Sequence, residues 1–172
     1  MKYVFVSDIH GNVERLEECV EAYEREQADK LVILGDTAGG YYDGDNYLLA
    51  EILNGMKDKV EVIRGNCDTS DFEDCLDFEI FDDDTLYVNN KFITIMHGHR
   101  NNCYNLPPNC GDIFIQGHTH VPMLIKQGGR ILANPGSVAR SRGSDLRCYI
   151  LIDEEYIYLK ALNGSLIKQE LL

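Results

Sequence analysis

Histidines in this chain stand where proteins place metal ligands. There are five, and each lies just after a segment predicted to be a strand: His10, His97, His99, His118 and His120. All but His10 lie in Gly-His contexts, which are His97-Gly98-His99 and Gly117-His118-Thr119-His120. A glycine beside a ligand lets the backbone approach closely and take unusual dihedral angles. The histidines therefore indicate a metal site rather than scattered surface positions.

Acidic and amide side chains accompany the histidines at other strand ends. Asp8 and His10 stand two residues apart, and residues at that spacing in an extended chain point the same way. Taken alone, this short and common pattern is more often a capping aspartate beside a surface histidine than half of a metal site. Asp36 and the run Asn66-Cys67-Asp68 also follow strands, each after a glycine. Oxygen and nitrogen ligands without a thiolate set suit Mn²⁺, Fe²⁺ or Zn²⁺ better than Ca²⁺ or Mg²⁺.

Predicted strands and helices alternate in the first part of the chain, and these elements must position the candidate residues. Apolar, β-rich runs predict strands over 3–7, 30–34 and 60–63. Apolar residues at helical spacing predict helices over 13–26 and 48–56. This order indicates parallel βαβ units, and the carboxyl ends of such strands meet at one edge of the sheet, where open α/β folds place their sites.

The later part of the chain predicts hairpins. Strand pairs are expected on either side of Asn89-Asn90 and of Gln127-Gly128-Gly129. A parallel half followed by an antiparallel half predicts an α/β fold, with two mixed sheets packed face to face and helices outside. No linker is apparent, so residues 1–172 are expected to form one domain. The further strands are expected over 113–116, 148–152, 156–162 and 166–171.

Composition limits the classes of function. Of the 172 residues, 44% are hydrophobic and 26% are charged, which is ordinary for a globular protein. The net charge of −13 argues against non-specific binding to nucleic acid. No apolar run approaches the length of about 18 residues that indicates a membrane span. The first strand directly follows Met1-Lys2, which leaves no room for a signal peptide, so a cytoplasmic location is expected.

Six motifs in order resemble those of the calcineurin-like metallophosphoesterases, and more narrowly their small YfcE-type phosphodiesterase branch. The resemblance covers nearly the whole chain and implies a four-layer α/β/β/α sandwich. The motifs are Asp8-x-His10, Gly35-Asp36, Gly65-Asn66-Cys67-Asp68, His97-Gly98-His99, Gly117-His118-Thr119-His120 and Asn134-Pro135-Gly136-Ser137.

The resemblance also implies a centre of two divalent metal ions, with Asp36 bridging them. Mn²⁺ is favoured, and Ni²⁺, Zn²⁺ and Fe²⁺ are the alternatives. A hydroxide between the ions would attack the phosphorus in line, while the ions neutralise the phosphoryl oxygens. The implied ligands of one ion are Asp8, His10, Asp36 and His120, and those of the other are Asp36, Asn66, His97 and His118.

One position departs from the pattern of many family members. Cys67 stands where they carry the histidine thought to protonate the leaving group, and a thiol with a pKa of about 8.5 is a poor general acid. His99 is the histidine without an implied metal, so it is the nearest substitute or a phosphate contact. A purely bracing role for His99 stays open. Asp68 is expected to orient a neighbouring group from behind the ligands.

Groups that contact the substrate are predicted from charge and position. Arg100, Arg140 and Arg142 could hold a phosphate through bidentate hydrogen bonds, or could pair with surface acids. Cys67 completes the predicted substrate contacts. Tyr41-Tyr42 could stack on a planar leaving group, or could belong to a plain surface loop.

Three functions follow from these residues. The first is a phosphodiesterase acting on a phosphate-ester small molecule or nucleotide, and the second is a phosphomonoesterase using the same metals. The third is a non-catalytic scaffold similar to a retromer subunit, in which the ligand set is eroded. All seven implied ligand positions are intact here, which favours an enzyme. A homo-oligomer formed through an exposed sheet edge stays open.

Overall fold

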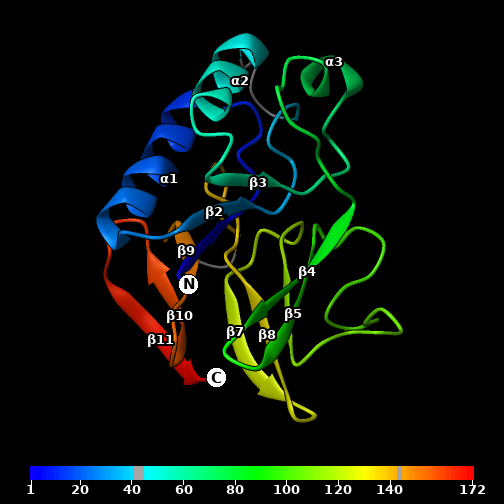
Figure 1. Cartoon of the computed structure of the whole chain (residues 1–172), viewed down its shortest axis with the longest axis vertical. Helices are drawn as coiled ribbons and strands as arrows, with labels where there is room; N and C mark the ends of the chain where they lie inside the picture. Colours follow the sequence, from blue (N-terminus) through cyan, green and yellow to red (C-terminus); the bar gives the residue numbers. More distant parts are fainter. Residues whose placement is uncertain (41–44, 143–144) are drawn as a thin grey trace.

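Two stacked β-sheets form the centre of the computed structural model, which describes residues 1–40, 45–142 and 145–172 (Figure 1). The first sheet has six strands in the order β11-β10-β9-β1-β2-β3. Its strands are β1 (Tyr3–Val6), β2 (Lys30–Ile33), β3 (Val60–Val62), β9 (Cys148–Ile152), β10 (Tyr156–Ala161) and β11 (Leu166–Leu171). Strands β1, β2 and β3 run parallel, whereas β9, β10 and β11 are antiparallel to their neighbours.

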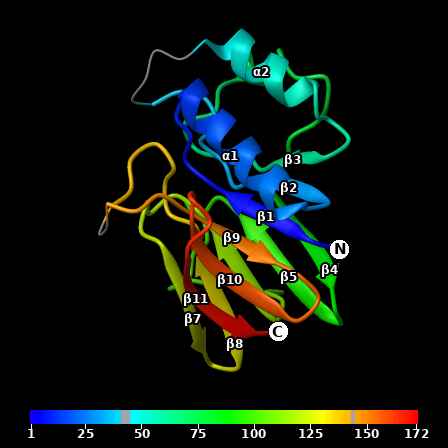
Figure 2. The same cartoon turned by 90° about the vertical axis from the view of Figure 1, so that its left-hand side faces the viewer.

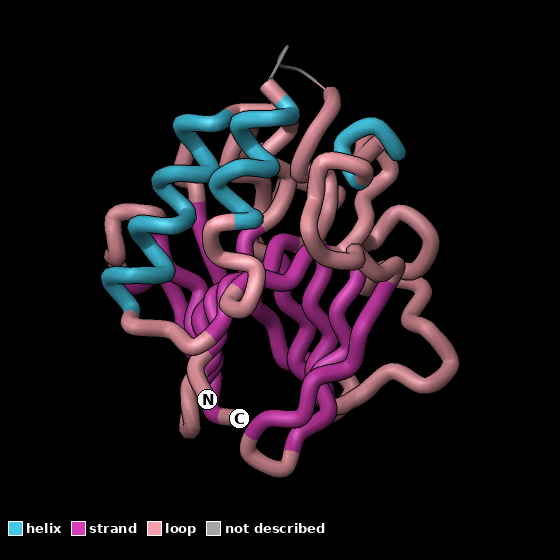
Figure 3. The backbone as a smooth tube through the Cα atoms, turned by 45° about the horizontal axis from the view of Figure 1, so that its top comes forward, coloured by secondary structure: helices cyan, strands magenta, loops and turns pink. Residues whose placement is uncertain are grey.

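The second sheet has five strands in the order β4-β5-β6-β8-β7. Its strands are β4 (Asp83–Val88), β5 (Lys91–Met96), β6 (Ile113–Gln116), β7 (Met123–Gln127) and β8 (Arg130–Asn134). The middle strands β5, β6 and β8 are parallel, and β4 and β7 close the edges as antiparallel partners. Figure 3 shows the two sheets facing each other, with helices on the first sheet's side.

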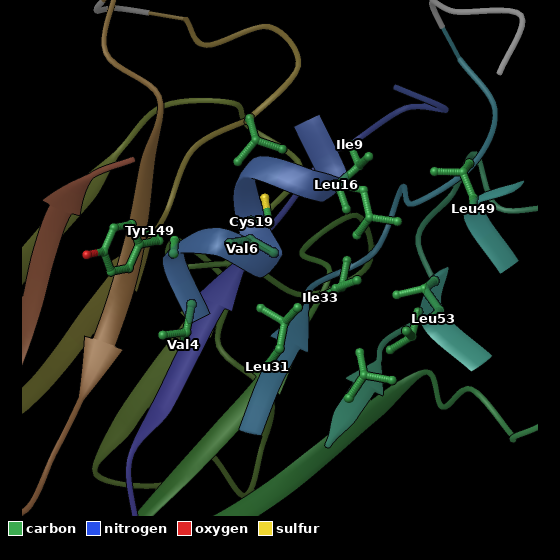
Figure 4. Close-up of a cluster of buried hydrophobic side chains, with 14 of the residues drawn as sticks. Val4, Val6, Ile9, Leu16, Cys19, Leu31, Ile33, Leu49, Leu53 and Tyr149 are labelled. Carbon is green, nitrogen blue, oxygen red and sulfur yellow. The ribbon is translucent and has the colours of Figure 1, made fainter. Parts of the chain in front are cut away.

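Two helices cover the outer face of the first sheet. They are α1 (Val13–Glu26) and α2 (Asn46–Asn54), and a short third helix, α3 (Ser70–Glu73), follows β3. The side chain of Asn12 caps α1 by accepting from the backbone N–H of Arg15. Buried residues of α1 and α2 pack on alternate residues of β1, β2 and β3 (Figure 4). Because each of these strands presents one face to the helices and the other to the second sheet, all their residues are apolar except Lys30 and Glu61.

A second apolar layer fills the space between the sheets. It contains Phe5 and Val32 from the first sheet, and Ile95, Ile115 and Ala133 from the second. The outer face of the second sheet is covered by the loop over 97–112, which in the described chain contains no helix. Three residues of this loop pack on Met96, Phe114 and Leu132, namely Cys103, Leu106 and Cys110.

Two mixed sheets packed face to face with flanking helices were expected, and the structure confirms them. The expected division into a parallel half and an antiparallel half is wrong. The meander of β9, β10 and β11 pairs with the free edge of β1 and extends the first sheet, as Figure 2 shows. The first sheet therefore joins strands from both ends of the chain. Among the described residues, no helix is long and apolar enough to cross a membrane.

Candidate metal centre

Polar side chains converge at the carboxyl ends of four strands. Asp8 and His10 follow β1, Asp36 follows β2, His97 follows β5 and His120 follows β6. All five are nearly inaccessible, with exposed fractions from 0% to 4%. Strands β1 and β2 are parallel, as are β5 and β6, so each sheet delivers its ligands at one edge. Burial of so many polar and titratable groups is costly unless hydrogen bonds or a bound group compensate for the lost water.

One group consists of Asp8, His10 and His120. The Nε2 atom of His120 lies 3.1 Å from Oδ1 of Asp8 and 3.3 Å from Nε2 of His10. Nε2 of His10 lies 3.8 Å from the same carboxylate oxygen. These three ligand atoms lie within 4.8 Å of one another, which is close enough for all to contact one cation.

Asp36 joins this group to a second one. Its Oδ2 atom lies 3.8 Å from Nε2 of His10, and its Oδ1 atom lies 3.4 Å from Nε2 of His97. The side-chain oxygen of Asn66 is 3.2 Å from the same nitrogen of His97. The two oxygens of Asp36 therefore face two separate sets of ligand atoms, the arrangement needed for a carboxylate that bridges two ions.

The histidine tautomers show why this cradle suits a cation. Nδ1 of each buried histidine faces a backbone carbonyl, which can only accept, so Nδ1 carries the hydrogen. In the neutral ring, the Nε2 lone pair then points at the carboxylates, where it cannot donate. Consistently, the buried Oδ1 atom of Asp8 has no hydrogen-bond partner among the residues that the structure describes. The Nδ1 contacts are His10 to Gly39 (3.3 Å), His97 to Leu34 (2.7 Å) and His120 to Arg140 (3.0 Å).

Facing lone pairs without a proton between them repel unless a positive ion separates them. The buried residues therefore fit a divalent metal ion of the kind that nitrogen and carboxylate ligands bind. Backbone N–H groups complete the surroundings by donating to the outer sides of the carboxylates. His118 N donates to Oδ2 of Asp8 at 3.0 Å, and Cys67 N donates to Oδ1 of Asp36 at 2.8 Å. Such contacts fix the direction of each ligand.

Backbone conformation at the centre is strained. Five of the implied ligands have positive φ angles: Asp8 (59°), His10 (51°), Asp36 (51°), His118 (64°) and His120 (63°). Left-handed conformations of residues other than glycine cost about 1–3 kcal/mol each and gather at functional sites. Close packing of glycines accompanies the strain. A Cβ atom on Gly65 would lie 2.1 Å from the backbone nitrogen of Asp36, so only glycine fits there.

The pKa values of the buried groups depend on burial and on the negative charges of the carboxylates. Burial alone would raise the pKa of Asp36, but the close interaction with the His97 ring and the hydrogen bond from the N–H of Cys67 outweigh burial and hold the pKa well below the usual range. Burial lowers the pKa of His97, but the nearby carboxylates of Asp36 and Asp8, which favour the charged ring, raise it overall. Burial dominates at His10 and lowers its pKa. A positive charge is therefore favoured beside Asp36 and His97.

The other implied ligands lie at the exposed rim. Asn66 and His118 are exposed, and the His118 ring is 5.1 Å from that of His97. His99 is also exposed, with its ring 5.5 Å from His97 and 6.3 Å from His118. These side chains are accessible to a bound substrate. The structure thus brings His99 to the rim of the centre, as a proton donor or phosphate contact would require.

Asp68 and Cys67 lie behind and beside Asp36. The Asp68 carboxylate accepts from the backbone N–H groups of Ala38 at 2.9 Å and Gly65 at 2.8 Å, and so ties together two ligand-bearing loops. Burial raises the pKa of Asp68 to about 6. Cys67 Sγ is 3.2 Å from Nδ2 of Asn66. Burial and the charge of Asp36 raise the pKa of the Cys67 thiol to about 12, so the thiol stays protonated near neutral pH.

The three arginines predicted to contact the substrate differ in how they lie relative to the centre. The exposed guanidinium of Arg100 pairs with Asp82 at 3.1 Å. Arg140 and Arg142 touch the centre through their backbones, since the Arg140 carbonyl accepts from His120 and the Arg142 N–H donates to the His120 carbonyl at 2.7 Å. Tyr41 and Tyr42 lie outside the described residues.

The residues that hold the ligands in place were not predicted individually. Ser137 and Asn134 are buried and bond to the backbone around Asp8 and Gly117. Both belong to the Asn-Pro-Gly-Ser motif, the signal that could have identified them. The carbonyl groups of Leu34 and Gly39 leave no side-chain signal, because any residue supplies a carbonyl.

Fold and site together define a phosphoesterase of the metal-dependent kind. Residues 1–156 match the family model described as the calcineurin-like phosphoesterase superfamily domain, and the chain belongs to this family. It is 33% identical over 178 aligned residues to phosphodiesterase YfcE of Escherichia coli strain K12, covering 97% of this chain and 95% of that protein. The expected family is therefore confirmed.

Solved structures agree with this assignment. The structure of YfcE, a phosphoesterase from E. coli, superposes with a TM-score of 0.90 at 31% identity, covering 99% of this chain and 98% of that chain. Wild-type Vps29 from Entamoeba histolytica, solved with Zn²⁺, has a TM-score of 0.65 at 21% identity, covering 100% and 98% of the two chains. The likeness to Vps29 shows the shared fold alone.

Proposed function

We propose that this protein is a metal-dependent phosphodiesterase that hydrolyses a small phosphate diester or nucleotide. The observation that carries the proposal is the position of Asp36, whose two oxygens face the separate lone pairs of His10 and His97. The similarity to YfcE over almost the full length supports a diester as the substrate.

Two divalent ions, of which Mn²⁺ is favoured, would occupy the centre. Asp8, His10 and His120 would hold the first, Asn66, His97 and His118 the second, and Asp36 both. When bound, the ions would lower the pKa of a water molecule toward neutrality and neutralise phosphoryl oxygens. The chain's own contribution is to aim each ligand through its backbone contacts and to exclude water from the floor of the site.

Residues at the rim would handle the substrate. His99 is exposed beside His97 and His118, so its ring can reach a leaving-group oxygen and donate a proton to it. Cys67 is a weaker candidate, because a thiol with a pKa of about 12 gives up its proton reluctantly. Arg140 and Arg142 border the centre and are proposed to contact the phosphate. Arg100 would have to leave Asp82 to do so.

The alternatives make distinct predictions. A phosphomonoesterase would use the same ions, whereas a scaffold would need none of the buried ligand set. The intact set, including the unpartnered Oδ1 of Asp8, favours an enzyme. A cytoplasmic location remains a prediction, as does a homo-oligomer, for which β11 offers a free and exposed edge of the first sheet.

The experiment is a comparison of two chromogenic esters. The purified protein, supplied with Mn²⁺, should cleave bis-p-nitrophenyl phosphate faster than p-nitrophenyl phosphate. Faster cleavage of the monoester would replace the first proposal by the phosphomonoesterase. If neither ester is cleaved with Mn²⁺, Ni²⁺ or Zn²⁺, the non-catalytic scaffold is the function that remains.

A further inference from the structure

Ser137 connects two side chains that the proposed function assigns to the same metal ion. Its hydroxyl donates to the backbone carbonyl of Asp8 at 2.8 Å and accepts from the backbone N–H of Arg140 at 2.8 Å. The carbonyl of Arg140 in turn accepts from Nδ1 of His120 at 3.0 Å. A continuous path of contacts thus runs from the backbone of Asp8 through Ser137 to the ring of His120.

Burial makes this connection hard to replace with water. Ser137 and Asp8 are both 0% exposed. Without the hydroxyl, the longer contact from the N–H of Ala139, at 3.3 Å, would be the one that the described residues still make to the carbonyl of Asp8. Asp8 and His120 also hold positive φ angles, of 59° and 63°. Strained conformations persist only where surrounding contacts enforce them, so the Ser137 hydroxyl stands where such enforcement is needed.

Ligands of the second ion are anchored by different groups. Nδ1 of His97 donates to the carbonyl of Leu34 at 2.7 Å, and Oδ1 of Asp36 accepts from the N–H of Cys67 at 2.8 Å. These two contacts come from the ends of β2 and β3, not from the segment that contains Ser137. Loss of the Ser137 hydroxyl should therefore disturb the ligand set that contains Asp8 and His120, and leave the set that contains His97 in place.

We propose that Ser137 is a positioning residue for the metal ion held by Asp8, His10, Asp36 and His120. It fixes the ring orientation of His120 and the backbone from which the Asp8 carboxylate projects. Groups that orient metal ligands in this way typically change metal affinity about 10- to 100-fold when they are removed. The inference rests on the proposed function, because it takes the assignment of ligands to two ions from it.

Mn²⁺ binding measured by calorimetry in two backgrounds separates the ions. His97→Ala leaves the Asp8, His10 and His120 set intact, whereas His120→Ala leaves the His97 and Asn66 set. Adding Ser137→Ala should weaken Mn²⁺ binding about 10- to 100-fold in the His97→Ala background. The same change should leave Mn²⁺ binding unaltered in the His120→Ala background, since the ion that remains there is anchored elsewhere.

Thr94→Val is the matched control. Thr94 is buried on β5, and its hydroxyl accepts from the N–H of Gly111 at 3.0 Å, so the variant loses a buried hydroxyl away from the ligands. It should leave Mn²⁺ affinity unchanged in both backgrounds. Circular dichroism of the metal-free proteins checks folding, and Ser137→Cys, with a weaker donor, replaces Ser137→Ala if that variant does not fold.

Two results would overturn the role of Ser137. One is unchanged Mn²⁺ affinity in the His97→Ala background, and the other is an equal loss in both backgrounds, which would mark a general effect on the fold. Absence of Mn²⁺ binding by the wild-type protein would contradict the proposed function itself, so the two failures are distinguishable.

Discussion

Oδ1 of Asp36 lies 3.4 Å from Nε2 of His97, and the two residues belong to different sheets. Asp36 follows β2 of the first sheet and His97 follows β5 of the second. The contact therefore closes the gap between the sheets at the edge where their parallel strands end. Because the other oxygen of Asp36 faces His10, a single carboxylate joins ligands from both sheets into one centre.

Asp36→Asn should abolish diester hydrolysis and reduce Mn²⁺ binding at both positions. The amide keeps the shape of the side chain but loses its charge, and one of its two donors would face a ligand atom. Turnover of bis-p-nitrophenyl phosphate should fall by at least about 10²–10³-fold, the scale set by loss of one preorganised electrostatic group. Asp58→Asn, at an exposed carboxylate before β3, should retain activity. Turnover by Asp36→Asn at the wild-type rate would exclude the bridging role.

His99→Ala should slow hydrolysis most for esters with poor leaving groups. A general acid contributes about 10²–10⁴-fold when the leaving oxygen needs a proton, and far less for p-nitrophenolate, which leaves without one. The rate ratio between an alkyl and a nitrophenyl diester should therefore change in the variant. Asn109→Ala, an exposed change in the same loop, is the control. An equal loss for both esters would assign His99 to loop bracing or phosphate contact instead.

Removal of metal should destabilise the protein. The facing lone pairs of His10 and His120, 3.3 Å apart at Nε2, are relieved only when a positive charge lies between them. Mn²⁺ at 100 times its dissociation constant should add about 2.7 kcal/mol per site to the free energy of unfolding. Thermal unfolding measured with Mn²⁺ and after chelation checks this. Identical unfolding temperatures in the two conditions would show that no ion binds the folded state.

Glu61 gives the fold a dependence on pH. It lies on β3 opposite Val32 and so faces the space between the sheets, where its buried Oε1 atom has no hydrogen-bond partner in the described part of the chain. Burial and the nearby charge of Asp84 raise the pKa of Glu61 to about 7. The folded state thus holds the Glu61 proton more tightly than the unfolded state. Glu61 therefore lowers the stability as pH rises from about 4.5 toward 7.

Glu61→Gln removes this ionisation and should stabilise the protein above pH 7, by about 1–2 kcal/mol after allowance for partial exposure. Below pH 4.5 the variant and the wild type should be nearly equal, since both are uncharged at this position. Denaturant unfolding at a series of pH values measures the difference. Glu17→Gln, at an exposed position on α1, should show no such trend. A constant difference across pH would refute the ionisation of Glu61 as its cause.

Much of the centre is predictable from sequence because ligands at strand ends need only the strand order to be brought together. Asp8, Asp36 and His97 come next to one another as soon as their strands are parallel neighbours or face each other. The segments that contain the motifs also contain the positive φ angles and the close glycine contacts. Short local patterns therefore contain the proposed metal ligands.

Contacts that depend on distant loops were not predictable in this way. Arg100 pairs with Asp82, and His120 bonds to the carbonyl of Arg140, across separations of 18 and 20 residues. Neither contact leaves a local pattern, because charged surface residues have many candidate partners and every residue has a carbonyl. The pairing of β9 with β1 escaped prediction for a related reason: a meander pairs with whichever sheet edge is free.

The most direct test of the account is anomalous diffraction from crystals grown with Mn²⁺. Two peaks about 3.5–4 Å apart are predicted, as in other two-metal sites, with Asp36 touching both. One peak should lie among Asp8, His10 and His120, and the other beside His97 and Asn66. A single peak, or two peaks of which one does not touch Asp36, would contradict the bridged centre on which the proposed function rests.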